Sequence, residues 1–196
     1  MKRVLVVYST NAGSTEEVAS AVADELGCDA QVQVDLRRMA EVSELESYDA
    51  VVVGAPMILG WQRAAVQFVK KHQRVLANKP VAYFCTLKSL TQAALGAPAP
   101  APLFIDPQLP KPPQHVGRLS IKERYATLPN YLGPMLKAAP AVHPVSVAFL
   151  GGKLELFRLK WWQMLFVMVI IGAQPGDHRN WSGITQWAAE LRSCLL

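Results

Sequence analysis

The chain has 196 residues, of which 51% are hydrophobic and 18% are charged, and its formal net charge is +5. This length and composition fit a single domain, residues 1–196, with a substantial core. The net positive charge suits an anionic ligand or anionic lipid. The chain has no run of five basic residues and no nucleic-acid recognition module, so we expect no nucleic-acid partner. The scattered cysteines and histidines predict no metal site, and the thiols are expected to be reduced in a cytoplasmic protein.

The amino-terminal segment predicts a buried strand that leads through a polar turn into a helix. Residues 4–8 are apolar and β-branched, and the apolar positions of residues 16–26 recur at helical spacing. The uncharged turn between them consists of Ser9, Thr10, Asn11, Ala12, Gly13, Ser14 and Thr15. Such a turn directs backbone N–H groups and a helix dipole at one point, which suits a phosphate. An ordinary loop with a helix cap is the alternative, because the turn matches neither the dinucleotide fingerprint nor the Walker motif.

Further strands alternate with helices in the first half of the chain. Residues 31–36 alternate apolar and polar side chains, whereas residues 50–54 and 81–87 are continuous apolar runs typical of central parallel strands. An amphipathic helix is predicted over residues 64–76. This order predicts an α/β fold, a doubly wound parallel sheet with helices on both faces. Ligands of such sheets bind beyond the carboxyl ends of the strands, so we expect the loops after the first, third and fourth strands to converge.

Two of these loops carry the other candidate ligand contacts. The loop after the third strand consists of Ala55, Pro56, Met57, Ile58, Leu59, Gly60 and Trp61. The loop after the fourth strand consists of Cys85, Thr86, Leu87, Lys88 and Ser89. Large apolar side chains in the first of these loops favour a wall for a flat ligand. The alternative is that they fold back onto the core.

The middle of the chain is a proline-rich insertion, about residues 90–126. Its composition favours extended or disordered structure, and its prolines cannot donate ladder hydrogen bonds. A tolerated surface insertion and a lid over the ligand rim are the two interpretations. After it, residues 127–139 predict a short helix interrupted near Gly133 and Pro134, and residues 145–150 predict the fifth strand.

The last part of the chain predicts two helices. The apolar segment Leu154–Ile171 is too short to span a bilayer, so no transmembrane helix is expected. The cations and tryptophans at its head suit a peripheral contact with the inner face of the cell membrane. A buried or dimer-forming helix, the latter giving a homo-oligomer, is the alternative. The closing helix is predicted to bury one side, formed by Trp181, Ile184, Trp187, Ala188 and Leu191.

Several segments together resemble the flavodoxin-domain family: STNAGST, YDAVVVGAPMILGWQRAAVQFVKKH, LFRLKWWQMLFVMVIIG and GDHRNWSGITQWAAEL. Within that family they are most similar to the bacterial quinone-dependent, oxygen-independent protoporphyrinogen IX dehydrogenases. The resemblance covers nearly the whole chain except the proline-rich insertion. It implies a flavodoxin-like five-stranded parallel sheet, an extra apolar helix before the last helix, and FMN as cofactor. It also implies a reaction of heme biosynthesis, in which hydride passes from a tetrapyrrole substrate to the flavin and on to a quinone.

The resemblance also implies roles for the candidate residues. Residues 9–15 would hold the FMN phosphate with hydroxyls and amides, and the flavin ring would lie between residues 55–61 and 85–89. Trp61 is the expected stacking residue. The cations Lys88, Arg63, Lys122 and Arg124 near the rim would suit the propionates of a tetrapyrrole. No catalytic side chain is assigned.

The chain departs from this family pattern in two places. Ile58 and Leu59 stand where relatives often carry a polar or basic residue and an aromatic one. The proline-rich stretch replaces a region that in the relatives is thought to help substrate or membrane engagement. Both departures bear on the substrate more than on the cofactor.

Three alternative functions fit the same sequence but involve another partner or no cofactor. An electron-transfer flavodoxin docks through an acidic face, against which the net charge of +5 argues. Another FMN-dependent quinone reductase, using nicotinamide, fits the same loops. A flavodoxin-like binding module that has lost FMN is favoured by the apolar loop at residues 57–61 and by the insertion.

Overall fold

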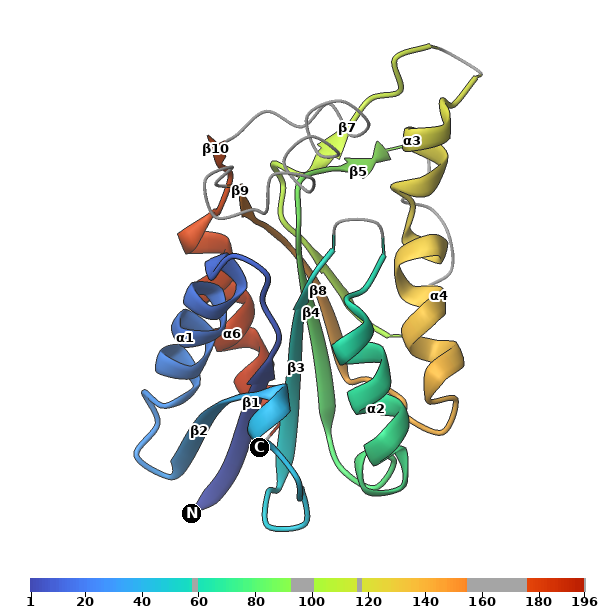
Figure 1. Cartoon of the computed structure of the whole chain (residues 1–196). Coiled ribbons are helices and arrows are strands. Elements are labelled where there is room, and N and C mark those ends of the chain that lie inside the picture. The colour runs from blue at the N-terminus through green and yellow to red at the C-terminus, as the bar shows by residue number, and fades with distance from the viewer. Residues whose placement is uncertain (58–59, 93–100, 116–117, 155–175, 196) are drawn as a thin grey trace.

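The computed structural model describes residues 1–57, 60–92, 101–115, 118–154 and 176–195 (Figure 1). Its main sheet has the strand order β2-β1-β3-β4-β8-β6, and every neighbouring pair is parallel. The strands are β1 (Lys2–Tyr8), β2 (Val32–Arg38), β3 (Ala50–Pro56), β4 (Val81–Leu87), β6 (Leu103–Ile105) and β8 (Ser146–Gly151). The apolar runs of β1, β3, β4 and β8 are buried because helices cover both faces of the sheet.

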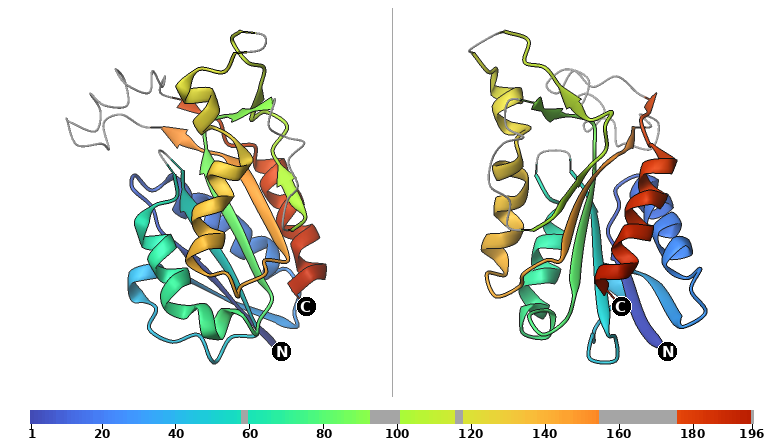
Figure 2. Two further views of the ribbon diagram at one scale, coloured as in Figure 1. Left: turned by 90° about the vertical axis from the view of Figure 1, so that its right-hand side faces the viewer. Right: turned by 180° about the vertical axis from the view of Figure 1, so that it is seen from behind.

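In the part of the chain that the structure describes, helices cover both faces of this sheet (Figures 1 and 2). Helices α1 (Ser14–Leu26) and α6 (Trp181–Leu195) pack on one face, in a core that contains Val22 and Trp187. Helices α2 (Arg63–Leu76) and α4 (Leu128–Ala138) pack on the other face, around Phe68 and Met135. The predicted α/β, flavodoxin-like architecture is therefore confirmed.

The sheet has six strands instead of the expected five, because the proline-rich insertion contributes β6 at its edge. Leu103 pairs with Val147 of β8 and Ile105 pairs with Phe149. The ladder continues at both ends, where Val147 donates its N–H to Pro102 O at 3.0 Å and Asp106 donates its N–H to Phe149 O at 3.0 Å. The backbone is extended here, as one of the two alternatives predicted, but the expectation that the segment makes no ladder hydrogen bonds was wrong, because the prolines flank the strand and leave its own N–H groups in place.

Smaller elements lie above the carboxyl ends of the strands. From the insertion come β5 (Leu90–Thr91), which pairs in parallel with β7 (Pro110–Lys111), and the short helix α3 (Ile121–Tyr125). Strands β9 (Lys153–Leu154) and β10 (Gly176–Asp177) form an antiparallel pair, and a 3₁₀ turn, η1, spans Met39–Glu41. These elements stand at the end of the sheet where ligand sites are expected (Figure 1).

Two further expectations are corrected by the helices. Helix α4 runs without interruption through Pro134, because Leu132 and Met135 beside it are buried in the core and offset the lost helix hydrogen bond. Trp181, expected on the buried side of α6, is 43% exposed because it opens the helix, and Arg179 stacks over its ring at 4.5 Å.

The helix predicted over Leu154–Ile171 lies outside the described residues from residue 155 onward. None of the helices within the described ranges is long and apolar enough to cross a membrane.

Candidate functional site

The first loop turns tightly from strand β1 into helix α1. Gly13, immediately before the helix, has φ 92°, in the left-handed region that favours glycine, and donates its N–H to Thr10 Oγ1 at 2.9 Å. Ser9 donates its N–H to Gly54 O at 3.0 Å, which fixes the loop to β3. Ser9 Oγ is buried and has no hydrogen-bond partner among the described residues. An unpaired hydroxyl beside a helix amino terminus fits a phosphate, whose oxygens would accept hydrogen bonds from the hydroxyl and from the first N–H groups of the helix.

Hydrogen bonds join the three predicted loops at one rim. The hydroxyl oxygens of Thr15 and Thr86 lie 2.9 Å apart and both side chains are buried, so the start of α1 is held against the end of β4. Met57 donates its N–H to Thr86 O at 2.8 Å. Gln62 donates through Nε2 to Asn11 Oδ1 at 2.5 Å. The loops after β1, β3 and β4 therefore converge, as the alternation of strands and helices predicts.

The loop after β3 turns its described large side chains inward. Met57 and Trp61 bridge to each other and are each 6% exposed. The Trp61 indole donates its N–H to Tyr131 O at 2.5 Å and meets Tyr83 edge-on at 6.2 Å. Ile58 and Leu59 lie outside the described residues. The stacking role of Trp61 stays a prediction, and its core packing argues for the alternative in which these side chains fold back onto the core.

The loop after β4 passes from the core to the rim within a few residues. Cys85 is buried, and burial raises the pKa of its thiol well above the ordinary value, so the thiol stays protonated and is a poor nucleophile. Leu87 is also buried, whereas Lys88 and Ser89 are partly exposed. Burial lowers the pKa of Lys88, and the nearby positive charge of Lys111 lowers it further. Lys88 is thus a cation at the rim with a second cation close by.

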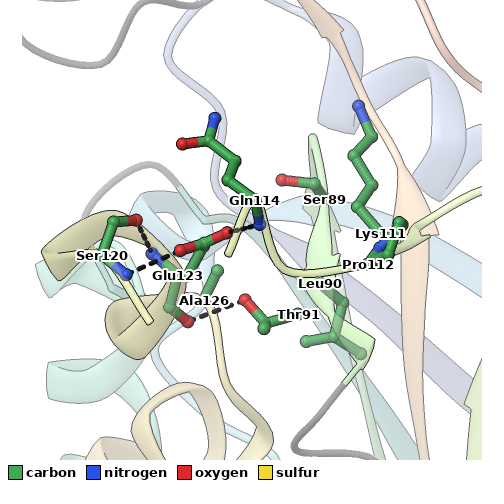
Figure 3. A pocket seen from close by; sticks show the side chains of 9 residues that line it. All are labelled: Ser89, Leu90, Thr91, Lys111, Pro112, Gln114, Ser120, Glu123 and Ala126. Carbon is green, nitrogen blue, oxygen red and sulfur yellow. Dashed lines mark hydrogen bonds between the residues drawn. The ribbon is translucent and has the colours of Figure 1, made fainter. Parts of the chain in front are cut away.

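A cavity of about 520 Å³ opens next to this loop (Figure 3). It lies between β5, β7 and α3, so all its walls come from the insertion or from the end of the β4 loop. Its lining residues are Ser89, Leu90, Thr91, Lys111, Pro112, Gln114, Ser120, Glu123 and Ala126. Most of the lining residues are polar or charged, and Leu90, Pro112 and Ala126 supply the apolar part.

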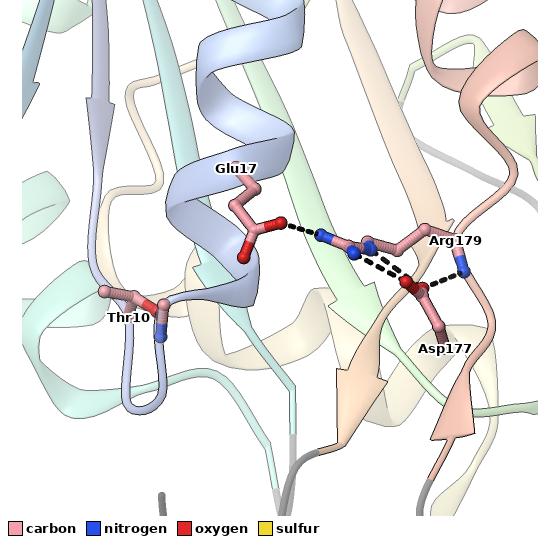
Figure 4. A network of polar contacts seen from close by, with 5 residues as sticks. Thr10, Glu17, Asp177 and Arg179 are labelled. Carbon is pink, nitrogen blue, oxygen red and sulfur yellow. Dashed lines mark hydrogen bonds and ion pairs between the residues drawn. The ribbon is translucent and has the colours of Figure 1, made fainter.

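An ion cluster that the sequence did not predict braces the phosphate loop from the side of helix α6 (Figure 4). Arg179, whose side chain is only 5% exposed, donates to Glu17 at 2.6 Å and to Asp177 at 2.5 Å. The pKa of Asp177 is lowered mainly by its hydrogen bond from Arg179. Glu17 lies in the first turn of α1, so Arg179 places a positive charge beside the carboxylate nearest the predicted phosphate site. Nothing in the local pattern around Arg179 distinguishes it from an exposed arginine in a turn.

The structure brings the predicted loop residues 9–15, 55–57, 60–61 and 85–89 to one rim. Of the predicted basic residues, Lys88 lies at this rim, and Arg63 is exposed where α2 begins, directly after the loop at residues 55–61. Arg124 of α3 is also exposed, and the side chain of Lys122 lies outside the described part. Sequence reasoning missed Lys111, because one lysine among prolines carries no periodic signal. Within the described ranges, no group of three or more His, Cys, Asp or Glu side chains could hold a metal ion.

Comparison with known proteins gives matches at the level of family, sequence and fold. The family model described as "Flavodoxin domain" matches residues 5–180. The protoporphyrinogen IX dehydrogenase [quinone] of Escherichia coli strain K12 is 38% identical over 85 residues. That stretch covers 42% of this chain and 46% of the relative, so less than half of the relative's length is matched.

Solved flavodoxin structures are similar to this chain at low sequence identity. The C101A mutant of flavodoxin from Pseudomonas aeruginosa is 12% identical, covers 98% of each chain and has a TM-score of 0.50. The two-electron reduced flavodoxin of Megasphaera elsdenii is 13% identical, with 95% of this chain and 98% of that chain covered and a TM-score of 0.49. Because the family model spans most of the chain and the loop at residues 9–15 fits a phosphate, the chain belongs to the flavodoxin-domain family, and its cofactor is FMN.

Proposed function

We propose that this flavodoxin-domain oxidoreductase dehydrogenates a reduced tetrapyrrole of the protoporphyrinogen type, with a quinone as electron acceptor. The observation that carries the proposal is the 38% identity to a relative named protoporphyrinogen IX dehydrogenase [quinone]. Because that match spans less than half of the relative, the substrate and the acceptor belong to the proposal and not to the family assignment. A net charge of +5 supports it further, since it suits an anionic substrate.

The chain's own residues bind and orient the cofactor in this proposal. Ser9, Thr10 and the first N–H groups of α1 hold the phosphate, and the buried Thr15–Thr86 contact keeps that loop at a fixed position relative to β4. The flavin ring would lie between the loop at residues 55–61 and the loop at residues 85–89. FMN, when bound, supplies the two-electron chemistry that accepts a hydride from the substrate and returns electrons to the quinone. No side chain is assigned a proton transfer.

The proposal also covers the domain organisation, membrane contact and oligomeric state of the protein. We keep residues 1–196 as one domain, and a peripheral membrane contact through Leu154–Ile171 would bring the protein to a lipid-borne quinone. A homo-oligomer through the same segment is the competing use of its apolar surface. Flotation with anionic liposomes at low salt separates the two, because only the membrane contact carries the protein upward with the lipid.

The test is anaerobic reduction of the FMN-loaded protein, followed by flavin absorbance. We expect protoporphyrinogen to bleach the flavin and a quinone to restore its colour, with NADH and NADPH inactive. Thr10→Glu should weaken FMN binding about 100-fold, because a carboxylate then faces the phosphate. Thr185→Glu, an equal charge change on the exposed side of α6, should bind FMN like the unaltered chain.

Other outcomes point to other functions. Bleaching by a nicotinamide but not by protoporphyrinogen would replace the proposal with a nicotinamide-dependent quinone reductase. A chain that ignores added FMN would be a binding module on the same fold.

A further inference from the structure

Helix α2 carries positive side chains along one stripe of its surface. Its sequence contains no acidic residue, and its exposed positions include Arg63, Lys70, Lys71 and Arg74. With 3.6 residues per turn, these four positions lie within about 100° of one another around the helix axis, over a length of about 17 Å. The opposite side of the helix, which includes Phe68, is buried against the sheet. The four cations therefore face away from the core.

Helix α4 extends this positive surface. It packs beside α2 on the same face of the sheet (Figure 2, left). It also lacks acidic residues, and Lys137 in its last turn is exposed. The chain has 20 basic and 15 acidic residues, so without the five cations of these two helices the two numbers are equal. The excess charge of the whole chain therefore equals the charge of one surface, which we call the α2–α4 face and which comprises Arg63, Lys70, Lys71, Arg74 and Lys137.

The cations of the α2–α4 face have no carboxylate partner. Among the described residues, none of the five forms an ion pair. The segment that borders α2 carries Glu41 and Glu46, but their carboxylates accept backbone N–H groups, of Arg38 at 3.3 Å and of Leu45 at 2.9 Å. On the opposite face of the sheet, by contrast, three of the four acids of α1 are paired with arginines. The unneutralised charge of the described residues is thus concentrated on the α2–α4 face.

The composition of the α2–α4 face favours lipid headgroups over a protein as its anionic partner. Protein interfaces are enriched in aromatic side chains and depleted in lysine, whereas three of these five cations are lysines. The large apolar side chains that are exposed in the described part of the chain are Met1, Tyr125 and Trp181, and none of them belongs to α2 or α4. Clustered lysines and arginines on the polar side of an amphipathic helix are typical of binding to anionic lipids.

We propose that the α2–α4 face docks on the surface of an anionic lipid bilayer, through attraction between its cations and the lipid phosphates. The stripe begins at Arg63, directly after the loop at residues 55–61, so a bilayer along α2 reaches the rim of the cofactor site. The inference rests on the proposed function for the use of this contact, which is access of a lipid-borne quinone to that rim. It adds a folded surface to the membrane contact through Leu154–Ile171. Salt weakens such docking, because the Debye length is only about 10 Å at 0.1 M ionic strength.

The experiment is flotation of the FMN-loaded full chain with two kinds of vesicle, phosphatidylcholine alone and phosphatidylcholine with about one third phosphatidylglycerol. At low salt the chain should float with the anionic vesicles and not with the neutral ones. Lys70→Gln/Arg74→Gln should weaken binding to the anionic vesicles about 30-fold, because two charges leave the stripe. Lys70→Arg/Arg74→Lys keeps both charges and should bind like the unaltered chain. Lys2→Gln/Arg37→Gln, the same charge change at exposed positions of β1 and β2, is the matched control and should weaken binding no more than about threefold.

Several results would overturn the docking face. The first is absence of flotation with the anionic vesicles, and the second is equal weakening by Lys2→Gln/Arg37→Gln, which would show that net charge alone matters. Flotation that is unchanged in Lys70→Gln/Arg74→Gln would assign the membrane contact to Leu154–Ile171 instead. A chain that ignores both kinds of vesicle but binds polyglutamate, and loses this binding in Lys70→Gln/Arg74→Gln, would have an acidic protein as its partner in place of a bilayer.

The docking face and the proposed reaction can fail separately. Oxidation of protoporphyrinogen with a water-soluble quinone and no lipid tests the reaction alone, and Lys70→Gln/Arg74→Gln should react like the unaltered chain there. Charge-dependent flotation of a chain that fails to oxidise protoporphyrinogen would support the docking face and refute the reaction. The reverse result, oxidation without flotation, would refute the docking face and support the reaction. FMN fluorescence quenching in each variant verifies that the cofactor site is intact.

Discussion

Gly54 lies in strand β3 beneath the rim, where its carbonyl accepts the N–H of Ser9. A Cβ at this position would lie 2.0 Å from Phe84 Cζ, inside the core on the α1–α6 face. Phe84 in turn meets Trp187 edge-on, with ring centroids 5.9 Å apart. The ring therefore has no free space into which it could withdraw. A side chain at residue 54 would therefore have to displace Phe84 or strand β3 beneath the rim.

Gly54→Ala should lower the free energy of unfolding by about 2–3 kcal/mol, the cost of overpacking a filled core. It should also weaken FMN binding, since Ser9 is attached to the displaced carbonyl. Urea denaturation and FMN titration measure the two effects. Gly133→Ala is the matched control, because nothing lies within 4 Å of a Cβ there and alanine should stabilise α4 by up to about 1 kcal/mol. If both variants are equally stable, the close approach of Phe84 is not a constraint.

At the scale of elements, the neighbouring residues Glu16 and Glu17 in the first turn of helix α1 form ion pairs that differ in burial. Glu16 meets Arg38 of β2 at 2.8 Å, and the two side chains are 38% and 56% exposed. Glu17 meets Arg179, which is 5% exposed and also holds Asp177 (Figure 4). The second arginine joins α1 to the segment that leads from β10 into α6. The ion pair of the exposed Arg38 can therefore be compared with that of the buried Arg179 within one helical turn.

Arg179→Met should cost about 1–3 kcal/mol of unfolding free energy, because it leaves two carboxylates without their common partner. Arg38→Met, at an exposed pair, should cost no more than about 1 kcal/mol. Thermal and urea unfolding of both variants provide the comparison. Arg179→Met should in addition weaken FMN binding, because it removes a positive charge beside the first turn of α1, where the phosphate is predicted to bind. Equal stability of the two variants would mean that the buried arginine does not brace the loop.

The individual strands and loops also differ in whether the sequence could predict them. Strands β1, β3, β4 and β8 are continuous apolar runs, so their burial and parallel order follow from composition and alternation alone. The loops at residues 9–15 and 85–89 follow from the position of those strand ends. Trp61 could not be assigned in this way, because its core packing depends on Tyr131, which lies 70 residues away. Strand β6 was missed because its pairing with β8 is a long-range contact that no local pattern records.

At the scale of the whole molecule, Asp106 joins three distant segments. Its carboxylate is buried and accepts from the N–H of Gln108 at 3.0 Å, the N–H of Gly151 at 3.3 Å and Nδ2 of Asn180 at 3.2 Å. These donors come from the insertion, the end of β8 and the segment before α6. Gly151 lies so close to the backbone of His178 that a Cβ would meet His178 O at 1.8 Å. The insertion is therefore part of the folded body and not an appendage.

Asp106→Ala should lower the free energy of unfolding by about 2–4 kcal/mol, because it leaves buried donors from separate segments unsatisfied. Limited proteolysis should then cut the insertion faster than in the unaltered chain. Asp29→Ala, which removes an acceptor from an exposed turn at Gln31, should change stability by less than about 1 kcal/mol. Resistance of the insertion to protease in Asp106→Ala would contradict this anchoring role.

Strand β6 also changes what the molecule presents to its neighbours in solution. Without it, the longer strand β8 would end the sheet and offer an open row of backbone donors and acceptors to another chain. With it, the outermost strand spans only Leu103–Ile105 and is bounded by Pro102 and Pro107. A short edge closed by prolines is a poor template for intermolecular β-pairing. The insertion that shapes the cavity thereby also protects the protein against aggregation along this edge.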